Sequence, residues 1–257
     1  MTLLPGHHLY PTPDGWRAAL PGDRFVRIDG PDELLSAFQR AAHGHDGPPD
    51  RATDAEQLHR FFAERGLLAD PEPEPAPPRV LLTGDGPVAD AVAAVLGAWA
   101  RVRRAGRPTE VDLLVDCAGW LPDARWHDLD TTCAATGLPW HRCHAEGTSF
   151  LVGPLTVPGR SPGYRDLRGR RLAASGVPDE LGRYWSWLDT AQAPPVPDPG
   201  PGVAAVVAGL LADEVAAWWR TGETGPVGYQ TEVSTNPVRL TRHPVLALPG
   251  LAAVDPA

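Results

Sequence analysis

Two glycines separated by one residue, Gly84 and Gly86, follow a short apolar run and precede a segment rich in alanine and valine. A strand, a glycine turn and a helix start let the backbone approach a pyrophosphate, which is the chemistry of dinucleotide binding. Dinucleotide binders also place an acid near the end of the second strand to hold the ribose. The stretch at that place, residues 101–106, reads RVRRAG and contains no acid, although its arginines would suit a 2'-phosphate. We favour a structural turn, and a vestigial nucleotide site at Gly84 and Gly86 is the alternative.

Histidines and cysteines offer metal-ligand chemistry at residues 141–144, which read HRCH, with His127 upstream. Zinc needs ligands that converge on one point. On a strand, side chains 141 and 143 share one face while 144 points to the other. We therefore predict no metal site. A catalytic cysteine is also not supported, because no G-x-S-x-G elbow is present and neighbours in sequence do not define a geometry.

The N-terminal residues offer a third kind of chemistry, recognition of a peptide by a sheet edge. An open edge can add an extended peptide as a further strand, with backbone bonds giving affinity and side-chain pockets giving selectivity. The alternative is that the apolar residues form the module's own core, and we favour that for Leu58 and for one of two phenylalanines. The predicted peptide-binding residues are Phe25, Val26, Arg27 and Ile28 on the edge strand, and Leu58, Phe61, Phe62 and Arg65 on a helix beside it.

These side chains require a small sheet followed by helices. Turn residues separate residues 7–10, 16–20 and 25–28, which predicts three antiparallel strands. Apolar residues at helical spacing then predict helices over 31–44 and 53–66. The same order occurs in DNA-reading winged helices, but this segment holds more acids than arginines.

A run of prolines and acids, PEPEPAPP at residues 71–78, is typical of a semi-rigid spacer. We therefore place a recognition domain at 1–70 and a second domain at 79–257. In the second domain, a strand over 79–83, the glycine turn and a helix over 88–100 are typical of the start of a Rossmann-type unit.

Later segments predict more of an α/β domain. Residues 111–117 read as a buried parallel strand, and residues 139–144 and 149–157 read as strands joined by a turn at Glu146 and Gly147. A proline-rich connector over 188–202 precedes a helix over 203–220, and the tail holds strand-like segments with many breakers. The expected fold class is α/β, with a winged helix-turn-helix module of three strands then helices, followed by a degenerate Rossmann-type domain.

The composition of the chain limits the classes of partner that it could bind. The chain has 257 residues and a formal net charge of -9, which argues against nucleic acid because phosphate binding needs clustered cations. No secretory signal is read at the start, and no uninterrupted apolar stretch is expected to span a membrane. The cysteines, Cys117, Cys133 and Cys143, fit no motif spacing, so we expect a cytoplasmic protein. All 23 basic residues are arginine.

Four segments in order carry a family resemblance: LLPGHHLY at 3–10 with Trp16 shortly after, LLTGDGPV at 81–88, GPLTVPG at 153–159 and RHPV at 242–245. The chain resembles, over nearly its whole length, leader-peptide-binding proteins from the biosynthesis of ribosomally made, modified peptides. In that family a winged-helix recognition element precedes a ThiF-like domain. Members of this thiazole/oxazole-cyclodehydratase partner type bind the precursor's leader and deliver its core to a separate YcaO enzyme, which cyclises Cys, Ser or Thr with ATP.

The departures from the family are informative. Relatives commonly carry C-x-x-C after the Val-Pro-Gly turn and a second pair after His-Pro, which together hold a structural zinc. Here GYRD at 163–166 and residues 246–251 occupy these places, so the resemblance implies that zinc is absent. Catalytic ThiF relatives hold ATP with a lysine and an acid, and this chain has no lysine. Arginine replaces the charge but not the compact ammonium.

We therefore predict a recognition subunit that is not itself an enzyme and that uses no cofactor. Its partners would be a precursor leader peptide and a modifying enzyme of the YcaO type, with neither nucleic acid nor membrane, and a homodimer is left open. Two alternatives remain: a ThiF-like adenylating or nucleotide-dependent enzyme that acts on a peptide, and a winged-helix regulator.

Overall fold

The computed structural model describes residues 2–42, 52–64, 66–69, 75–190, 192–224, 227–235 and 237–249. The chain divides into two compact units, Met1–Glu74 and Pro75–Ala257, and this division falls inside the proline- and acid-rich run. Each unit has its own hydrophobic core.

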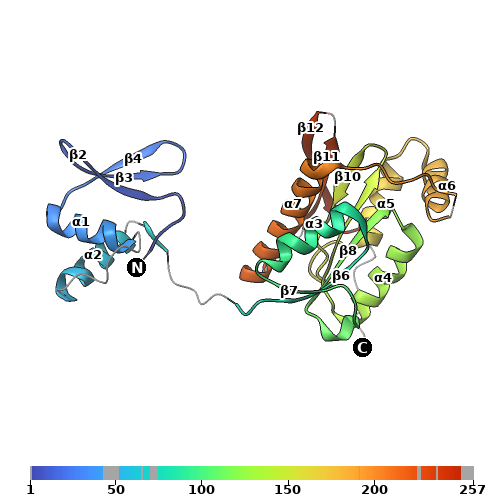
Figure 1. Cartoon of the computed structure of the whole chain (residues 1–257), viewed down its shortest axis with the longest axis horizontal. Coiled ribbons are helices and arrows are strands. Elements are labelled where there is room, and N and C mark those ends of the chain that lie inside the picture. Colours follow the sequence, from blue (N-terminus) through green and yellow to red (C-terminus); the bar gives the residue numbers. More distant parts are fainter. Residues whose placement is uncertain are drawn as a thin grey trace. The chain divides into compact units, whose positions relative to one another are not determined.

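The first unit contains the expected small sheet and two helices (Figure 1). Its antiparallel strands lie in the order β2, β3, β4, and a short antiparallel pair, β1 and β5, brings the two ends of the unit together. Tight turns join the sheet strands, and Gly22 adopts a φ of 78° between β3 and β4, a conformation that favours glycine. The elements are β1 (Thr2–Leu3), β2 (His8–Thr12), β3 (Gly15–Leu20), β4 (Arg24–Ile28), α1 (Asp32–Ala42), α2 (Ala52–Glu64) and β5 (Leu68–Ala69).

The core of this unit forms where one sheet face meets the helices. Phe38 of α1 stacks on Phe62 of α2, with ring centroids 4.2 Å apart, and both rings are buried. Trp16 of β3 is also buried, and its indole N–H donates a hydrogen bond of 2.9 Å to Asp32 at the start of α1. The label of winged helix for this unit remains a prediction.

The second unit is built on a mixed sheet of seven strands in the order β12, β11, β10, β9, β8, β6, β7. The strands β6, β7, β8 and β9 are parallel, as in a Rossmann-like fold, whereas β10, β11 and β12 are antiparallel. The bounds are β6 (Arg79–Thr83), β7 (Arg101–Arg103), β8 (Leu113–Trp120), β9 (Trp140–Glu146), β10 (Ser149–Val152), β11 (Val227–Thr235) and β12 (Val238–Leu246).

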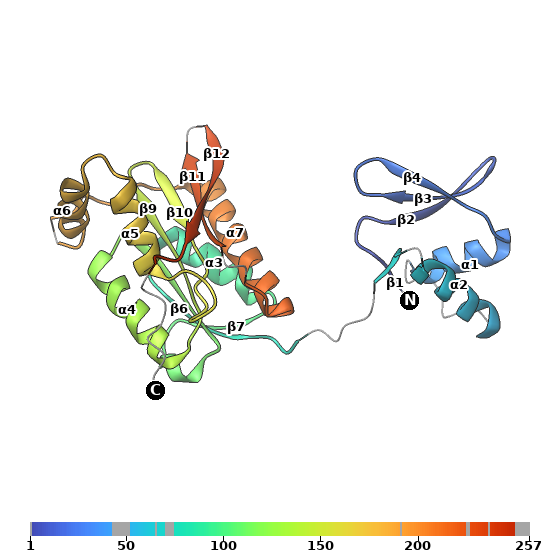
Figure 2. The ribbon, with the colours of Figure 1, turned by 180° about the vertical axis from the view of Figure 1, so that it is seen from behind.

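Helices cover both faces of this sheet (Figures 1 and 2). One face packs against α3 (Gly86–Gly97) and α7 (Gly200–Thr221), and the other against α4 (Asp123–Thr136), α5 (Tyr164–Ala174) and α6 (Pro178–Leu188). Alternation along the strands divides their side chains between the two cores, so Leu82 faces α3 and α7 while Leu81 lies on the opposite side. A short 3-10 helix, η1 (Pro108–Glu110), precedes β8.

The helix α7 is apolar over most of its length but is interrupted by Asp213, Glu214 and Arg220, so it does not contradict the expectation that no uninterrupted apolar stretch spans a membrane. Its 22 residues are long and apolar enough to cross a membrane by length and composition. In the structure, however, Val207, Leu211 and Val215 of α7 are buried in the core against the sheet and α3. This packing is that of a core helix, and one such helix is weak evidence for a membrane span.

Candidate functional site

The strand β4 lies at an edge of the first unit's sheet. Among the described residues it pairs with β3 alone, which leaves the backbone groups on its other side without a strand partner. The opposite edge, β2, contains Pro11, which has no N–H and therefore interrupts strand addition on that side. The edge β4 has no proline, so it is the better template for an added strand.

The side chains of β4 are more exposed than those of the strands behind it. Leu9, Ala18 and Val26 face one another across the three strands, on the side that packs against the helices. Leu9 and Ala18 are buried, whereas Val26 is 41% exposed because no further strand lies beside it. A peptide strand added at β4 would extend this apolar row by one side chain. Phe25, on the other sheet face, is 61% exposed.

The remaining predicted peptide-binding residues have different surroundings. Ile28 and Phe62 are buried in the unit's core, so their side chains stabilise the fold, and Ile28 offers the edge only its backbone. Phe61 is half-buried and contacts Phe62 edge-on, and Arg27 forms an exposed ion pair with Asp29 at 2.9 Å. Arg65 and the side chain of Leu58 lie outside the described residues.

The structure adds Arg24, which sequence reasoning missed because the strand was expected to begin one residue later. Arg24 is exposed at the start of β4 and lies on the same face as Val26, two residues away. It places a cation beside the apolar position on the free edge. The signal in the sequence was the glycine of the preceding turn, which allows the strand to begin at Arg24.

The glycine loop of the second unit begins where β6 meets α3. Gly84 has a φ of 94°, and a Cβ atom built on it would lie 1.8 Å from the carbonyl oxygen of Cys117 in β8. Gly84 is therefore required by the close approach of two backbone segments. Gly86 has a φ of 85° and opens onto free space. The helix N-terminus is present at the loop, but packing explains the first glycine without a ligand.

The arginines predicted near this loop bind protein groups. Arg104 donates to the carbonyl oxygen of Gly84 at 2.9 Å and to that of Ala89 at 3.1 Å, and its guanidinium lies 3.5 Å from Asp90. Arg103 lies 3.5 Å from Glu110. Arg103 and Arg104, two of the arginines that would suit a 2'-phosphate, are thus held by the chain's own acids and carbonyl groups.

The end of β8 is also occupied by the chain itself. The carboxylate of Asp116 is fully buried and accepts hydrogen bonds from Thr83, Arg125 and Trp126. Trp120 donates to the carbonyl oxygen of Pro194 at 2.6 Å, which fastens the proline-rich connector at this end of the sheet. Asp116 therefore acts as a structural acid that anchors β6 and α4 to β8.

The histidines and cysteines of β9 do not converge. His141 contacts Glu214 of α7 at 3.0 Å on one side of the sheet, and His144 packs edge-on against Trp126 on the other. Within the part of the chain that the structure describes, no group of three His, Cys, Asp or Glu side chains could hold a metal ion. Cys117, Cys133 and Cys143 are free and buried, and burial contributes to a raised pKa of the Cys133 thiol, about 12.

Hydrogen bonds join residues 163–166 and 246–248, the two segments where the sequence resemblance implied the loss of zinc ligands. Asp166 accepts from the backbone N–H of Gly163 at 2.8 Å and from that of Leu248 at 2.7 Å. Arg170 donates to the carbonyl oxygen of Ala247 at 2.9 Å and also to that of Leu246. These contacts tie the start of α5 to the chain that follows β12, and we call them the Asp166 clasp.

Comparison with known proteins establishes the fold. No family model and no curated protein matches the chain. A solved heterocyclase in complex with substrate and cofactor matches 96% of this chain at 16% identity and a TM-score of 0.67, and the heterocyclase TruD matches 96% at 15% and 0.57. The match covers 38% and 42% of those chains, so this chain spans about two-fifths of their length.

A second kind of structure matches end to end. The microcin C7 biosynthetic enzyme MccB in complex with N-formylated MccA matches 98% of this chain and 99% of its own, at 11% identity and a TM-score of 0.59. Escherichia coli MccB with selenomethionine MccA matches 97% of both chains at 12% identity and a TM-score of 0.56. At these identities the likeness shows a shared fold.

Proposed function

We propose that this chain is a recognition subunit that binds the leader of a ribosomally synthesised precursor peptide and presents the peptide's core to a separate modifying enzyme. The observation that carries the proposal is the free edge of β4, where Val26 and Phe25 are exposed beside unpaired backbone. An extended leader would pair with β4 as a fourth strand of the sheet. One of its apolar side chains would pack beside Val26, and an acidic side chain would meet Arg24 or Arg27.

The second unit would act as scaffold and docking surface for the modifying enzyme. The matched heterocyclase chains are more than twice as long as the region that this chain matches. A YcaO-type cyclodehydratase is the partner that the sequence resemblance implies. A cytoplasmic setting without nucleic acid or membrane belongs to the same proposal, and homodimerisation is compatible with it.

Several features of the second unit favour recognition over catalysis. Gly84 is explained by contact with the β8 backbone, and Arg104 is bound to the loop that would otherwise face a nucleotide. The buried Asp116 already accepts bonds from three protein donors. The chain has no lysine to hold a triphosphate.

The proposal is tested by searching the neighbouring genes for a short precursor peptide and titrating the full chain with the leader of that peptide by calorimetry. We expect saturable binding, and we expect Val26→Asp to weaken it about tenfold because it places a charge at the apolar position of the edge. Val177→Asp is the matched control, since Val177 is 63% exposed and lies in the second unit. Absence of leader binding to the full chain would refute the proposal.

The second candidate function is a nucleotide-dependent enzyme acting on a peptide. The end-to-end match to a structure named as a biosynthetic enzyme and the open space at Gly86 favour it. Calorimetric titration of the chain with ATP and magnesium should release or absorb heat if the chain is a nucleotide-dependent enzyme, and should give no heat if it is a recognition subunit. A winged-helix regulator would shift DNA in a salt-dependent way, which the acidic chain is expected not to do.

A further inference from the structure

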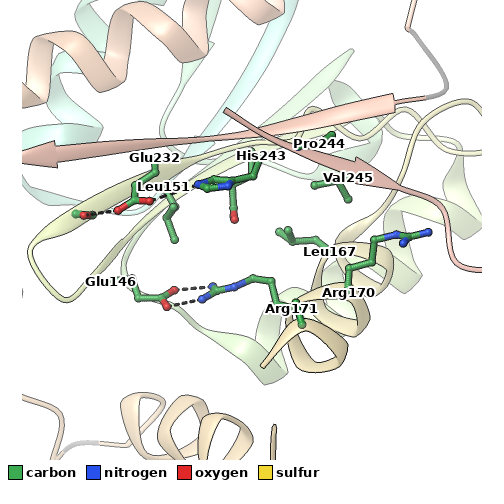
Figure 3. A pocket seen from close by; sticks show the side chains of 12 residues that line it. Glu146, Leu151, Leu167, Arg170, Arg171, Glu232, His243, Pro244 and Val245 are labelled. Atoms are coloured by element: carbon green, nitrogen blue, oxygen red, sulfur yellow. Dashed lines mark hydrogen bonds and ion pairs between the residues drawn. The ribbon is translucent and has the colours of Figure 1, made fainter. Parts of the chain in front are cut away.

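A cavity of about 440 Å³ lies in the second unit between α5 and the strands β10, β11 and β12 (Figure 3). Its volume is in the range of small-ligand sites. Leu151, Leu167 and Val245 supply apolar surface, and charged side chains stand around them. None of its lining residues belongs to the β4 edge or to the glycine loop.

The charged groups around this cavity are bound to one another. Arg171 holds Glu146 with two hydrogen bonds, of which the Nη1 to Oε2 bond is 2.6 Å. Glu232 accepts from Ser149 at 2.8 Å and lies 3.4 Å from His243. Figure 3 marks the contact between Glu232 and His243 with a dashed line. Arg170 donates to backbone carbonyl oxygens within the Asp166 clasp. A ligand with a strong charge would have to break one of these contacts.

Gln230 is the exception among the polar groups that line the cavity. The residue is 4% exposed, and its buried Nε2 has no hydrogen-bond partner among the described residues. A buried donor without an acceptor is unfavourable, and a turn of the Gln230 carboxamide toward the cavity would let it donate a hydrogen bond to a ligand's carbonyl oxygen. A carboxamide is also complementary to a peptide group, which carries both a donor and an acceptor.

We propose that this cavity is a second peptide-binding site that takes a neutral amide group with an apolar side chain. The Gln230 carboxamide turns toward the cavity on binding, so that the ligand's carbonyl oxygen accepts a hydrogen bond from Nε2. The ligand's side chain packs against Leu151, Leu167 and Val245. The natural ligand would be a segment of the precursor peptide outside its leader, and this identification rests on the proposed function. The chemistry of the cavity is independent of it.

The test is a titration of the isotope-labelled full chain with N-acetyl-L-leucinamide, followed by nuclear magnetic resonance. We expect saturable shifts of the side-chain amide signals that are missing from Gln230→Leu. We also expect that variant to bind about fivefold more weakly at the backbone signals of the cavity. N-acetyl-leucine, which has a carboxylate in place of the carboxamide, should bind no more tightly than the amide.

Two helix variants separate filling of the cavity from general effects. Ala174 is exposed and lines the cavity, so Ala174→Trp should block binding, whereas Ala173→Trp, exposed on the same helix but outside the lining, should not. Unmoved Gln230 signals, unchanged affinity in Gln230→Leu, or tighter binding of the carboxylate would each overturn the inference. Leader binding without leucinamide binding would overturn this inference alone. Leucinamide binding without leader binding would contradict the proposed function and leave the inference about the cavity intact.

Discussion

Gly84 and Gly86 share an unusual backbone conformation but differ in what surrounds them. Both have positive φ angles, and only at Gly84 would a Cβ meet another backbone, at 1.8 Å from the carbonyl oxygen of Cys117. We expect Gly86→Ala to lose roughly 1 to 2 kcal/mol of unfolding free energy from the strained φ alone. Gly84→Ala should lose at least about 3 kcal/mol, because β6 and β8 must separate. Urea denaturation measures both, and equal losses would contradict the packing role of Gly84.

Glu146 gives the fold an acid-sensitive contact. Burial, the largest single effect, would raise the pKa of this carboxyl, but the hydrogen bonds and charges of Arg171 and His144 together outweigh burial and lower the pKa to about 2. A lowered pKa means that the stabilisation is fully present above the unfolded value near 4.5 and is lost as the pH falls toward 2. Over that window the unfolding free energy should fall by up to about 1.4 kcal/mol per pH unit from this group.

Glu146→Gln checks this account. The variant should be less stable than the parent at neutral pH, and the difference should shrink as the pH falls from 4.5 toward 2. Urea unfolding at a series of pH values measures it. A constant difference across that window would mean that the charge of Glu146 contributes nothing.

Among elements, those with local signals were predictable from the sequence. The strands β2, β3 and β4 follow turn residues, and α1 and α2 follow apolar spacing, so their positions came out within a few residues. The hairpin of β11 and β12 was not predictable in this way. Its register depends on pairing over nine residues, β12 is an edge strand with Pro244 in it, and Val238 and Leu240 are exposed. Such a strand carries little apolar alternation to read.

The candidate site shows the same limit. The sequence indicated the edge at residues 25–28, because edge position follows from strand order. It could not decide which of Phe61 and Phe62 is buried, since both lie on the same apolar stretch and only stacking on Phe38 places Phe62 in the core. Gln230 carried no signal at all, because an unpaired buried amide is a property of the packed structure.

The Asp166 clasp is the element-scale feature whose energetics can be measured. Asp166→Ala removes acceptors for two backbone N–H groups, one at the start of α5 and one beyond β12, and should cost roughly 1 to 2 kcal/mol. Asp179→Ala, an exposed acid in the first turn of α6, is the matched control and should cost less. Because hydrogen bonds hold these segments, a zinc chelator should leave the thermal midpoint of the parent unchanged. A midpoint lowered by the chelator would indicate a bound metal and contradict the account.

At the scale of the whole molecule, two compact units divide the proposed work. The first presents an open strand, and the second provides a cavity and a large surface on a sheet covered by helices. In the proposed function this chain recognises the peptide, and a separate modifying enzyme performs the chemical step. This chain with precursor, ATP and magnesium should therefore give no product. Addition of a YcaO-type enzyme should form rings, each detected by mass spectrometry as the loss of one water.

The same reconstitution tests whether the β4 edge acts through binding. In the presence of the partner, Val26→Asp should lower the rate about tenfold at low peptide concentration and recover most of it at saturation, because a binding contact affects KM more than kcat. Val177→Asp should behave as the parent chain. A loss that persists at saturating peptide would place Val26 in the catalytic assembly instead, and ring formation without the partner would show that this chain is itself the enzyme.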